Sequence, residues 1–254
     1  MKDKVGRVFL IGAGPGDLGL LTLNAVDALK NADVIIYDRL VPQGWHRYAN
    51  PSARKINAGK TSGRSSTKQT QINRLLANHA LAGRTVARLK GGDPLVFGRG
   101  AEEAEYLSER NIPFTIIPGV SSITGVPGNA GIPLTHRRVS SSVAIVTGHE
   151  DPSKRSSSVR WGSLARAVDT LVVLMGAEKL EQITQELMQS GLPKATPCAV
   201  IVKGTSKDEV VLTGPLKNIA ARVRKLKLTP PALLIVGKVV ELRRRFLKSM
   251  RSFK

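Results

Sequence analysis

The sequence predicts an α/β protein made of two lobes, each built on a mainly parallel sheet. Three observations predict this class: short apolar strands alternate with helical segments, glycine-rich turns follow the strands, and the alternation restarts after Pro133. A chain of 254 residues is long enough for two such lobes. We predict lobes at residues 1–120 and 121–254, with the ligand site in the cleft between them.

The first lobe begins with an apolar strand at residues 5–11, which leads into the turn G-A-G-P-G-D at 12–17. Apolar residues at helical spacing then predict a helix over 20–29, with Thr22 near its start. The alternation continues with a strand at 34–37, a polar loop at 58–66, a helix at 70–81, a strand at 85–89, a turn at 91–94, a helix at 101–109 and a strand at 114–117. Parallel sheets bind ligands at the carboxyl ends of their strands, so the turns that follow these strands are the candidate site.

The second lobe repeats the pattern. Apolar runs predict strands at 142–147, 170–175, 198–202 and 232–236, and amphipathic spacing predicts helices at 180–188 and 219–225. The serine-rich stretch at 151–158 is too polar for a core and is predicted to be a loop.

The composition is strongly basic, with 39 Lys and Arg against 19 Asp and Glu and a formal net charge of +20. Half of this excess lies between Arg222 and the end of the chain. Such a balance suggests a polyanionic partner, although for the tail a solvated basic face is the favoured explanation. Aromatic residues are only 4%, which is too few for a surface that stacks nucleic-acid bases, so nucleic acid is not an expected partner.

Several classes of protein are excluded by what the sequence lacks. No apolar run approaches the roughly 20 residues of a membrane span, and the apolar stretch at 8–11 is too short for a signal peptide. The single cysteine, Cys198, excludes an intramolecular disulfide, and one cysteine with four histidines makes no expected metal site. We therefore expect a cytoplasmic protein with no membrane or metal partner.

The common nucleotide motifs are also missing. The turn at 12–17 has Asp17 where the dinucleotide fingerprint requires its third glycine, and Pro15 lacks an N–H that a pyrophosphate would use. Gly59-Lys60-Thr61 ends like a phosphate-binding loop, but the earlier glycine of that motif is absent. No G-x-S-x-G hydrolase elbow occurs. These reaction classes are not favoured.

Six turns at strand ends remain, at 12–17, 37–40, 91–100, 118–122, 174–176 and 202–205. Glycine at such places lets a ligand approach the backbone closely. Together these segments resemble the uroporphyrinogen-III C-methyltransferases of the tetrapyrrole methylase family. The resemblance covers residues 5–240 and is most specific in R-L-K-G-G-D-P-L-V-F-G-R-G at 88–100. Further segments that carry it are 8–17, 20–22, 34–41, 116–122, 130–137, 146–149 and 174–176.

The resemblance implies a two-lobed α/β fold, a homodimer, and S-adenosylmethionine (SAM) bound in the cleft between the lobes. It implies two successive methyl transfers to C2 and C7 of uroporphyrinogen III, which give precorrin-2 and S-adenosylhomocysteine. The positions that match cofactor-binding residues of the family are Pro15, Gly91, Gly92, Asp93, Val96, Ser121, Ser122, Met175 and Gly204. Asp38 matches the family's proposed proton acceptor, and Lys60 its proposed proton donor. The pair Ser121-Ser122 departs from the Thr-Ala or Thr-Ser pair often found there, but it keeps a hydroxyl.

The chemistry of SAM agrees with these residue types. SAM carries a sulfonium cation and no phosphate, so carbonyl-rich turns and a carboxylate suit it better than a cluster of N–H groups. Asp93 is a candidate to bind a ribose or amino group, although an Asp before a proline also forms turns by itself. Met175 is apolar and flexible enough to pack on adenosine, or it is simply a core residue.

Asp38 and Lys60 each have a second interpretation. Asp38 follows a strand and is a plausible general base for the proton that leaves the macrocycle, but it also has a possible surface partner in Arg39. Lys60 lies in a polar loop, where it would serve equally as an electrostatic anchor.

Uroporphyrinogen III bears eight carboxylates, so its site needs convergent cations. The candidates are Arg39, Lys60, Arg99, His136 and Arg137. Two other functions stay open: a related enzyme that acts on a later corrin precursor or on RNA, and a basic RNA-binding protein with a degenerate methylase fold. Because the resemblance accounts for most of the chain, we expect this chain alone to stop at precorrin-2.

Overall fold

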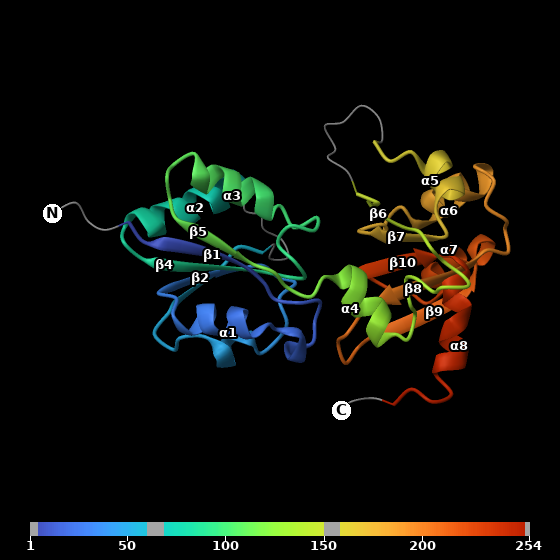
Figure 1. Cartoon of the computed structure of the whole chain (residues 1–254), viewed down its shortest axis with the longest axis horizontal. Coiled ribbons are helices and arrows are strands. Elements are labelled where there is room, and N and C mark those ends of the chain that lie inside the picture. Colours follow the sequence, from blue (N-terminus) through green and yellow to red (C-terminus); the bar gives the residue numbers. More distant parts are fainter. Residues whose placement is uncertain (1–4, 60–68, 150–157, 252–254) are drawn as a thin grey trace. The chain divides into compact units, whose positions relative to one another are not determined.

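The computed structural model describes residues 5–59, 69–149 and 158–251. The chain divides into two compact units, Met1–Ser122 and Ile123–Lys254, and Figure 1 labels most of their helices and strands. The two α/β lobes predicted from the alternation of strands and helices are present. Both polar loops that the sequence predicts, at 58–66 and 151–158, lie mostly outside the described residues.

The first unit is built on a five-stranded sheet in the order β3-β2-β4-β1-β5, in which every neighbouring pair is parallel. Its strands are β1 (Arg7–Gly12), β2 (Val34–Tyr37), β3 (Arg54–Asn57), β4 (Thr85–Lys90) and β5 (Phe114–Ile117). Parallel neighbours need long crossover connections, which the alternating helices supply. The mainly parallel sheet is therefore confirmed here, and the sequence reading missed only β3.

Helices cover both faces of this sheet: α1 (Leu23–Lys30) lies on one side, and α2 (Gln69–Leu81) and α3 (Gly100–Ser108) lie on the other (Figure 1). Successive side chains of β2 point to opposite faces of the sheet. Ile35 packs in the cluster that contains Leu29 of α1, whereas Ile36 packs with Leu76 of α2. Because both faces are buried, β2 is continuously apolar rather than alternating, which is why it could be recognised in the sequence.

The sequence predicts that the first helix begins at Leu20, but α1 begins three residues later, at Leu23. Residues Leu18–Leu20 form a 3₁₀ turn instead, and Asp17 accepts a hydrogen bond from the Gly19 N–H (2.8 Å) at its start. The α-helix begins only at Leu23, because the Thr22 hydroxyl caps it by accepting from the Ala25 N–H at 3.2 Å. The apolar periodicity continues through both segments and so hides the break between them.

The second unit holds a five-stranded mixed sheet in the order β6-β7-β10-β8-β9. Its strands are β6 (Val143–Thr147), β7 (Thr170–Leu174), β8 (Pro197–Val202), β9 (Val210–Pro215) and β10 (Ala232–Val236). Only β6 and β7 pair in parallel, and the other three pairs are antiparallel. The expected mainly parallel sheet is wrong for this unit. The connection at 203–209 is too short for a helical crossover, so β9, which the sequence reading missed, returns antiparallel to β8.

Three helices cover one face of this second sheet, namely α5 (Trp161–Ala167), α6 (Leu180–Gln189) and α7 (Leu216–Lys225). Their apolar side chains pack with those of β7, β8 and β10 in one cluster. The unit also contains α4 (Ser122–Asn129), which begins at the unit boundary, and α8 (Leu242–Phe246) near the basic end of the chain. The sequence reading missed α4, α5 and α8. In the described part of the chain, no helix is both long and apolar enough to cross a membrane.

Candidate active site at the carboxyl edge of the first sheet

Four turns meet where the strands of the first sheet end. The turn after β1 is hydrogen-bonded to the turn after β4: the Ala13 N–H donates to the Lys90 carbonyl (2.7 Å), and Gly14 and Gly92 exchange N–H···O bonds of 3.2 and 2.7 Å. The turn after β2 joins them, since the Asp38 N–H donates to the Leu89 carbonyl (3.1 Å). The four turns of the sequence analysis that lie in the first unit therefore form one continuous rim.

Glycines allow these turns to approach each other closely. A Cβ added to Gly119 would lie against the Gly92 carbonyl oxygen and the Gly12 Cα, closer than real Cβ atoms come to other atoms. Gly92 also has a φ of +68°, which favours glycine. The rim is therefore built from glycines because its backbones touch.

Replacing Gly119 with alanine is expected to destabilise the protein by about 1–3 kcal/mol, because neither backbone neighbour can move away from the new methyl group. Gly128→Ala in α4 is the matched control: nothing lies within 4 Å of the added Cβ, and alanine favours a helix. Urea unfolding of both variants measures the difference. Equal unfolding free energies for the two variants would contradict the close packing of the rim.

Asp93 connects two of the turns. Its Oδ1 accepts from the Leu95 N–H (2.8 Å) within its own turn, and its Oδ2 accepts from the Gly119 N–H (3.1 Å) in the turn after β5. The turn-forming interpretation of Asp93 is therefore confirmed. Its role as a ligand of the cofactor stays a prediction.

Asp38 is held by two cations that come from inside the sheet. Its Oδ1 accepts from Arg88 Nη2 at 2.6 Å, and its Oδ2 lies 3.8 Å from Lys90 Nζ. The Asp38 side chain is 31% exposed, whereas those of Arg88 and Lys90 are 2% and 3% exposed. None of the ion pairs among the described residues joins Asp38 to Arg39, so the surface pair expected as the alternative is wrong.

Behind these cations lies a second carboxylate, Glu103 of α3, which is completely buried. Its Oε1 accepts from Arg88 Nε (2.9 Å), Lys90 Nζ (2.9 Å) and Gln69 Nε2 (3.1 Å). We call Asp38, Arg88, Lys90 and Glu103 the charge cluster; it contains two cations and two carboxylates.

The charge cluster affects the pKa values of its cations differently. Burial, and then the Arg88 guanidinium, lower the pKa of Lys90 below its ordinary value, although Glu103 and Asp38 oppose the shift. Burial also acts to lower the pKa of Arg88, but Glu103 and Asp38 outweigh it and raise the pKa. The sequence analysis missed this cluster. The signal was present in β4, where two charged residues stand two positions apart in a buried strand and so point to the same face.

The charge cluster opens onto a pocket of about 510 Å³ in the first unit. Asp38, Arg88 and Lys90 line it, together with three residues that the sequence analysis singled out, Arg39, Gly91 and Arg99. Arg99 has a φ of +60° and forms an exposed ion pair with Glu102 at 2.6 Å. A left-handed arginine at a pocket wall is a strained arrangement of the kind that gathers at functional sites.

The other predicted residues of the first unit lie on or next to the rim. Pro15 is in the turn after β1, and Val96 follows Asp93, with its N–H donating to the Asp93 carbonyl at 3.4 Å. Ser121 and Ser122 follow the turn after β5, and the Ser122 nitrogen would lie 3.8 Å from a Cβ on Gly92. Lys60 lies outside the described residues.

The second unit carries the remaining predicted residues on turns of its own. Met175 follows β7 with a φ of 53°, and Gly204 follows β8 between Lys203 and Thr205, whose φ values are 49° and 63°. Both strands are antiparallel to β10, so their carboxyl ends lie at one edge of the sheet. His136 and Arg137 lie in the loop before β6, where the His136 N–H donates to the Ser140 carbonyl at 3.0 Å.

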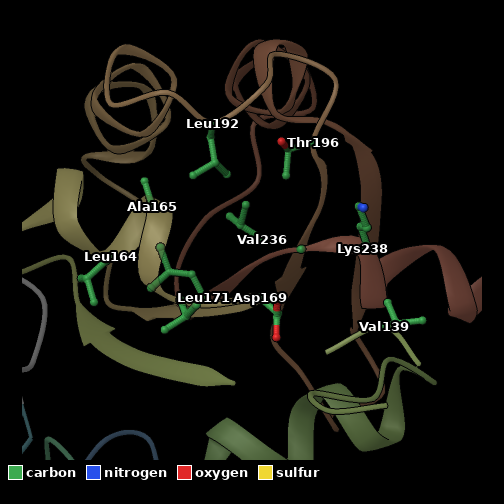
Figure 2. A pocket seen from close by; sticks show the side chains of 11 residues that line it. Val139, Leu164, Ala165, Asp169, Leu171, Leu192, Thr196, Val236 and Lys238 are labelled. Atoms are coloured by element: carbon green, nitrogen blue, oxygen red, sulfur yellow. The ribbon is translucent and has the colours of Figure 1, made fainter. Parts of the chain in front are cut away.

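A smaller pocket of about 220 Å³ lies at the opposite edge of the second sheet, where β7 and β8 begin (Figure 2). Most of the residues that line it are apolar, and Asp169, Thr196 and Lys238 are its polar members. The Asp169 carboxylate is already used, since its Oδ2 accepts from the N–H groups of Ser141 (2.8 Å) and Ser142 (3.2 Å). This pocket contains none of the residues predicted for the site.

Comparison with known proteins gives one consistent result. The model of the family described as Tetrapyrrole (Corrin/Porphyrin) Methylases matches residues 7–220. A Methanosarcina barkeri protein, named S-adenosyl-L-methionine-dependent uroporphyrinogen III methyltransferase, is 46% identical over 242 residues, which cover 95% of this chain and 95% of the relative. The siroheme synthase of Nitrosomonas eutropha is also 46% identical, over 95% of this chain but only 50% of its own length.

Among solved structures, the chain resembles a uroporphyrin-III C-methyl transferase from Thermus thermophilus complexed with S-adenyl homocysteine. The TM-score is 0.80 and the sequence identity 40%, with 93% of this chain and 100% of that chain covered. The family model's match at residues 7–220 extends over parts of both units.

Proposed function

The chain belongs to the tetrapyrrole (corrin/porphyrin) methylases, and we propose that it transfers methyl groups from SAM to C2 and C7 of uroporphyrinogen III, giving precorrin-2. The observation that supports this function most strongly is the arrangement at the first pocket. A carboxylate held by Arg88 stands there beside Arg39 and Arg99, whose charges suit a polycarboxylate.

The rim fits SAM better than a phosphate ligand. The N–H groups of Ala13, Gly14, Gly92 and Gly119 all donate to acceptors within the protein, and Pro15 has no N–H to offer. A pyrophosphate would therefore find none of these donors free, whereas a phosphate-free sulfonium compound does not need them. We propose that the rim residues Pro15, Gly91, Gly92, Asp93, Val96, Ser121 and Ser122, with Met175 and Gly204 of the second unit, hold SAM.

SAM supplies the electrophilic methyl group when it is bound. The protein's contribution is to hold the acceptor carbon in line with it, since correct alignment removes a large entropic barrier. Asp38 takes the proton that leaves the macrocycle after methylation, and Arg88 and Lys90 fix the position of its carboxylate. Arg39 and Arg99, with His136 and Arg137, bind substrate carboxylates. The role of Lys60 as proton donor stays a prediction. The lobe boundaries at 1–120 and 121–254 and the ligand site in a cleft between the lobes are also predictions. The same holds for the homodimer and the cytoplasmic location.

The function is tested by incubating the purified protein with uroporphyrinogen III and SAM without oxygen, and recording the absorption spectrum and product mass. We expect a macrocycle that has gained two methyl groups. Methylation of RNA instead, or RNA binding without any methyl transfer, would support one of the alternative functions and overturn this one.

Raising the salt concentration from 0.05 to 0.5 M is expected to lower kcat/KM for uroporphyrinogen III by about tenfold or more. The net charge of +20 attracts a polyanionic substrate, and dissolved salt screens this attraction and shortens its range. The value of kcat at saturating substrate is expected to change little, because attraction acts on encounter. A kcat/KM that does not respond to salt would contradict a steering role for the basic excess.

A further inference from the structure

Glu103 is the least expected member of the charge cluster. Its side chain has no exposed surface, and Oε1 alone accepts all three of its hydrogen bonds. Among the side chains that the structure describes, its Oε2 is the buried oxygen that lacks a hydrogen-bond partner. Burying a carboxylate together with two cations is costly, and replacing the whole group by apolar side chains of similar volume would often leave a protein as stable. Stability alone therefore does not explain why the protein keeps this buried group of charges.

The geometry links Glu103 to the pocket through two cations. Arg88 presents Nε to Glu103 at 2.9 Å and Nη2 to Asp38 at 2.6 Å. The guanidinium is planar and rigid, so fixing Nε from one side determines where Nη2 points on the other. Lys90 repeats the link, since its Nζ lies 2.9 Å from Glu103 and 3.8 Å from Asp38.

The remaining described neighbours offer no second buried carboxylate for these cations: the Ile36 carbonyl, which accepts from Arg88 Nη1 at 3.4 Å, is neutral. On α2, Gln69 donates to both Glu103 and Asn73, so an amide and not a charge faces the cluster from that helix. Arg39 and Arg99 line the pocket; Arg39 adds a positive charge, and Arg99 is paired with the exposed Glu102. Of the described residues in contact with the cluster, Glu103 is thus the carboxylate that balances Arg88 and Lys90 from the buried side.

We propose that Glu103 is a positioning residue, which acts through Arg88 and Lys90 to fix how Asp38 presents its carboxylate to the pocket. This inference rests on the proposed function, in which Asp38 takes a proton from the substrate. With Glu103 in place, each cation is shared between two carboxylates. Without its charge, both cations have Asp38 as their only anionic partner and draw closer to it, so that fewer of its lone pairs face the substrate.

The first test is Glu103→Gln, which keeps the shape of the side chain and removes its charge. We expect kcat to fall by about 10²-fold, as for other small displacements of a catalytic group, with an unchanged KM for SAM and a displaced acidic limb of the pH–kcat profile. The matched control is Glu105→Gln, on the exposed side of the same helix, which is expected to behave like the wild type. If Glu103→Gln behaves like Glu105→Gln, the proposal is wrong.

A double variant separates positioning from a merely structural role. Adding Lys90→Met to Glu103→Gln leaves one cation, Arg88, opposite one carboxylate, Asp38, and so restores the balance of charge. We expect this double variant to recover at least tenfold in kcat over Glu103→Gln and to return the pH profile toward that of the wild type. A double variant that is folded but no more active than Glu103→Gln overturns the proposal.

A third measurement does not depend on turnover. The ammonium of Lys90 is followed by NMR of lysine-labelled protein, with Lys90→Met identifying its signal. Because Glu103 opposes the lowering of the Lys90 pKa by burial and Arg88, Glu103→Gln is expected to lower that pKa further. An unchanged titration overturns the link through Lys90. If the titration shifts as expected but the wild type does not methylate uroporphyrinogen III, the proposed function fails and the charge linkage stands.

Discussion

Replacing Asp38 with asparagine is expected to lower kcat by about 10²- to 10⁴-fold, the range for loss of a general base, without weakening the binding of SAM. The amide keeps the size of the carboxylate and can still accept from Arg88, but it cannot take up a proton under the conditions of the assay. Steady-state rates of precorrin-2 formation measure the first effect, and calorimetric titration with SAM the second.

Asp27→Asn is the matched control, because Asp27 is an exposed residue of α1 that lies outside the site. Its activity is expected to equal that of the wild type. Thermal unfolding of both variants shows whether the loss of charge beside Arg88 has affected the fold. A folded Asp38→Asn protein with wild-type kcat would remove Asp38 from the mechanism.

Replacing Asp93 with alanine is expected to weaken the binding of SAM by about 10²-fold. The change removes the acceptors of two backbone N–H groups, those of Leu95 and Gly119, and hydrogen bonds to a charged group contribute about 1.5–3 kcal/mol each. Their loss releases the turn after β4 from the turn after β5, and with it the shape of the glycine rim. Calorimetric titration with S-adenosylhomocysteine measures the effect.

Asp93→Asn provides a graded comparison, since its side chain keeps one oxygen that can accept from one of the two N–H groups. We expect its affinity for S-adenosylhomocysteine to lie between those of the wild type and Asp93→Ala. If Asp93→Ala is folded and binds this ligand as tightly as the wild type, the turns do not depend on Asp93 for their binding geometry.

Most of the first unit could be predicted from the sequence, because both faces of its sheet are buried. β2 is apolar throughout, and β5 ends at Pro118, so their limits are visible in the sequence. The second unit was harder to predict. The strand β9 contains Gly214 and a final Pro215, both unfavourable in strands, and only its pairing with β8 shows that it belongs to the sheet.

The parts of the site that are turns after strands could be predicted from the sequence. The contacts between side chains that are far apart in the sequence could not. Asp38 and the glycine turns follow strands, and parallel strands bring their ends to one edge. The links of Arg88 to Asp38 and Glu103 span 50 and 15 residues of sequence, and no local pattern encodes such distances. The role of Asp93 in joining two turns was missed as well, because its partner Gly119 belongs to another strand.

The most direct test of this account is a single turnover with methyl-labelled SAM bound in advance and uroporphyrinogen III added in a rapid-mixing device. For the wild type we expect one labelled methyl group on the macrocycle for each SAM bound in advance; for Asp38→Asn we expect SAM to remain bound while transfer slows by at least 10²-fold. Transfer at the wild-type rate by Asp38→Asn, or label on a molecule other than the macrocycle, would contradict a methyl transfer that depends on the carboxyl edge of the first sheet.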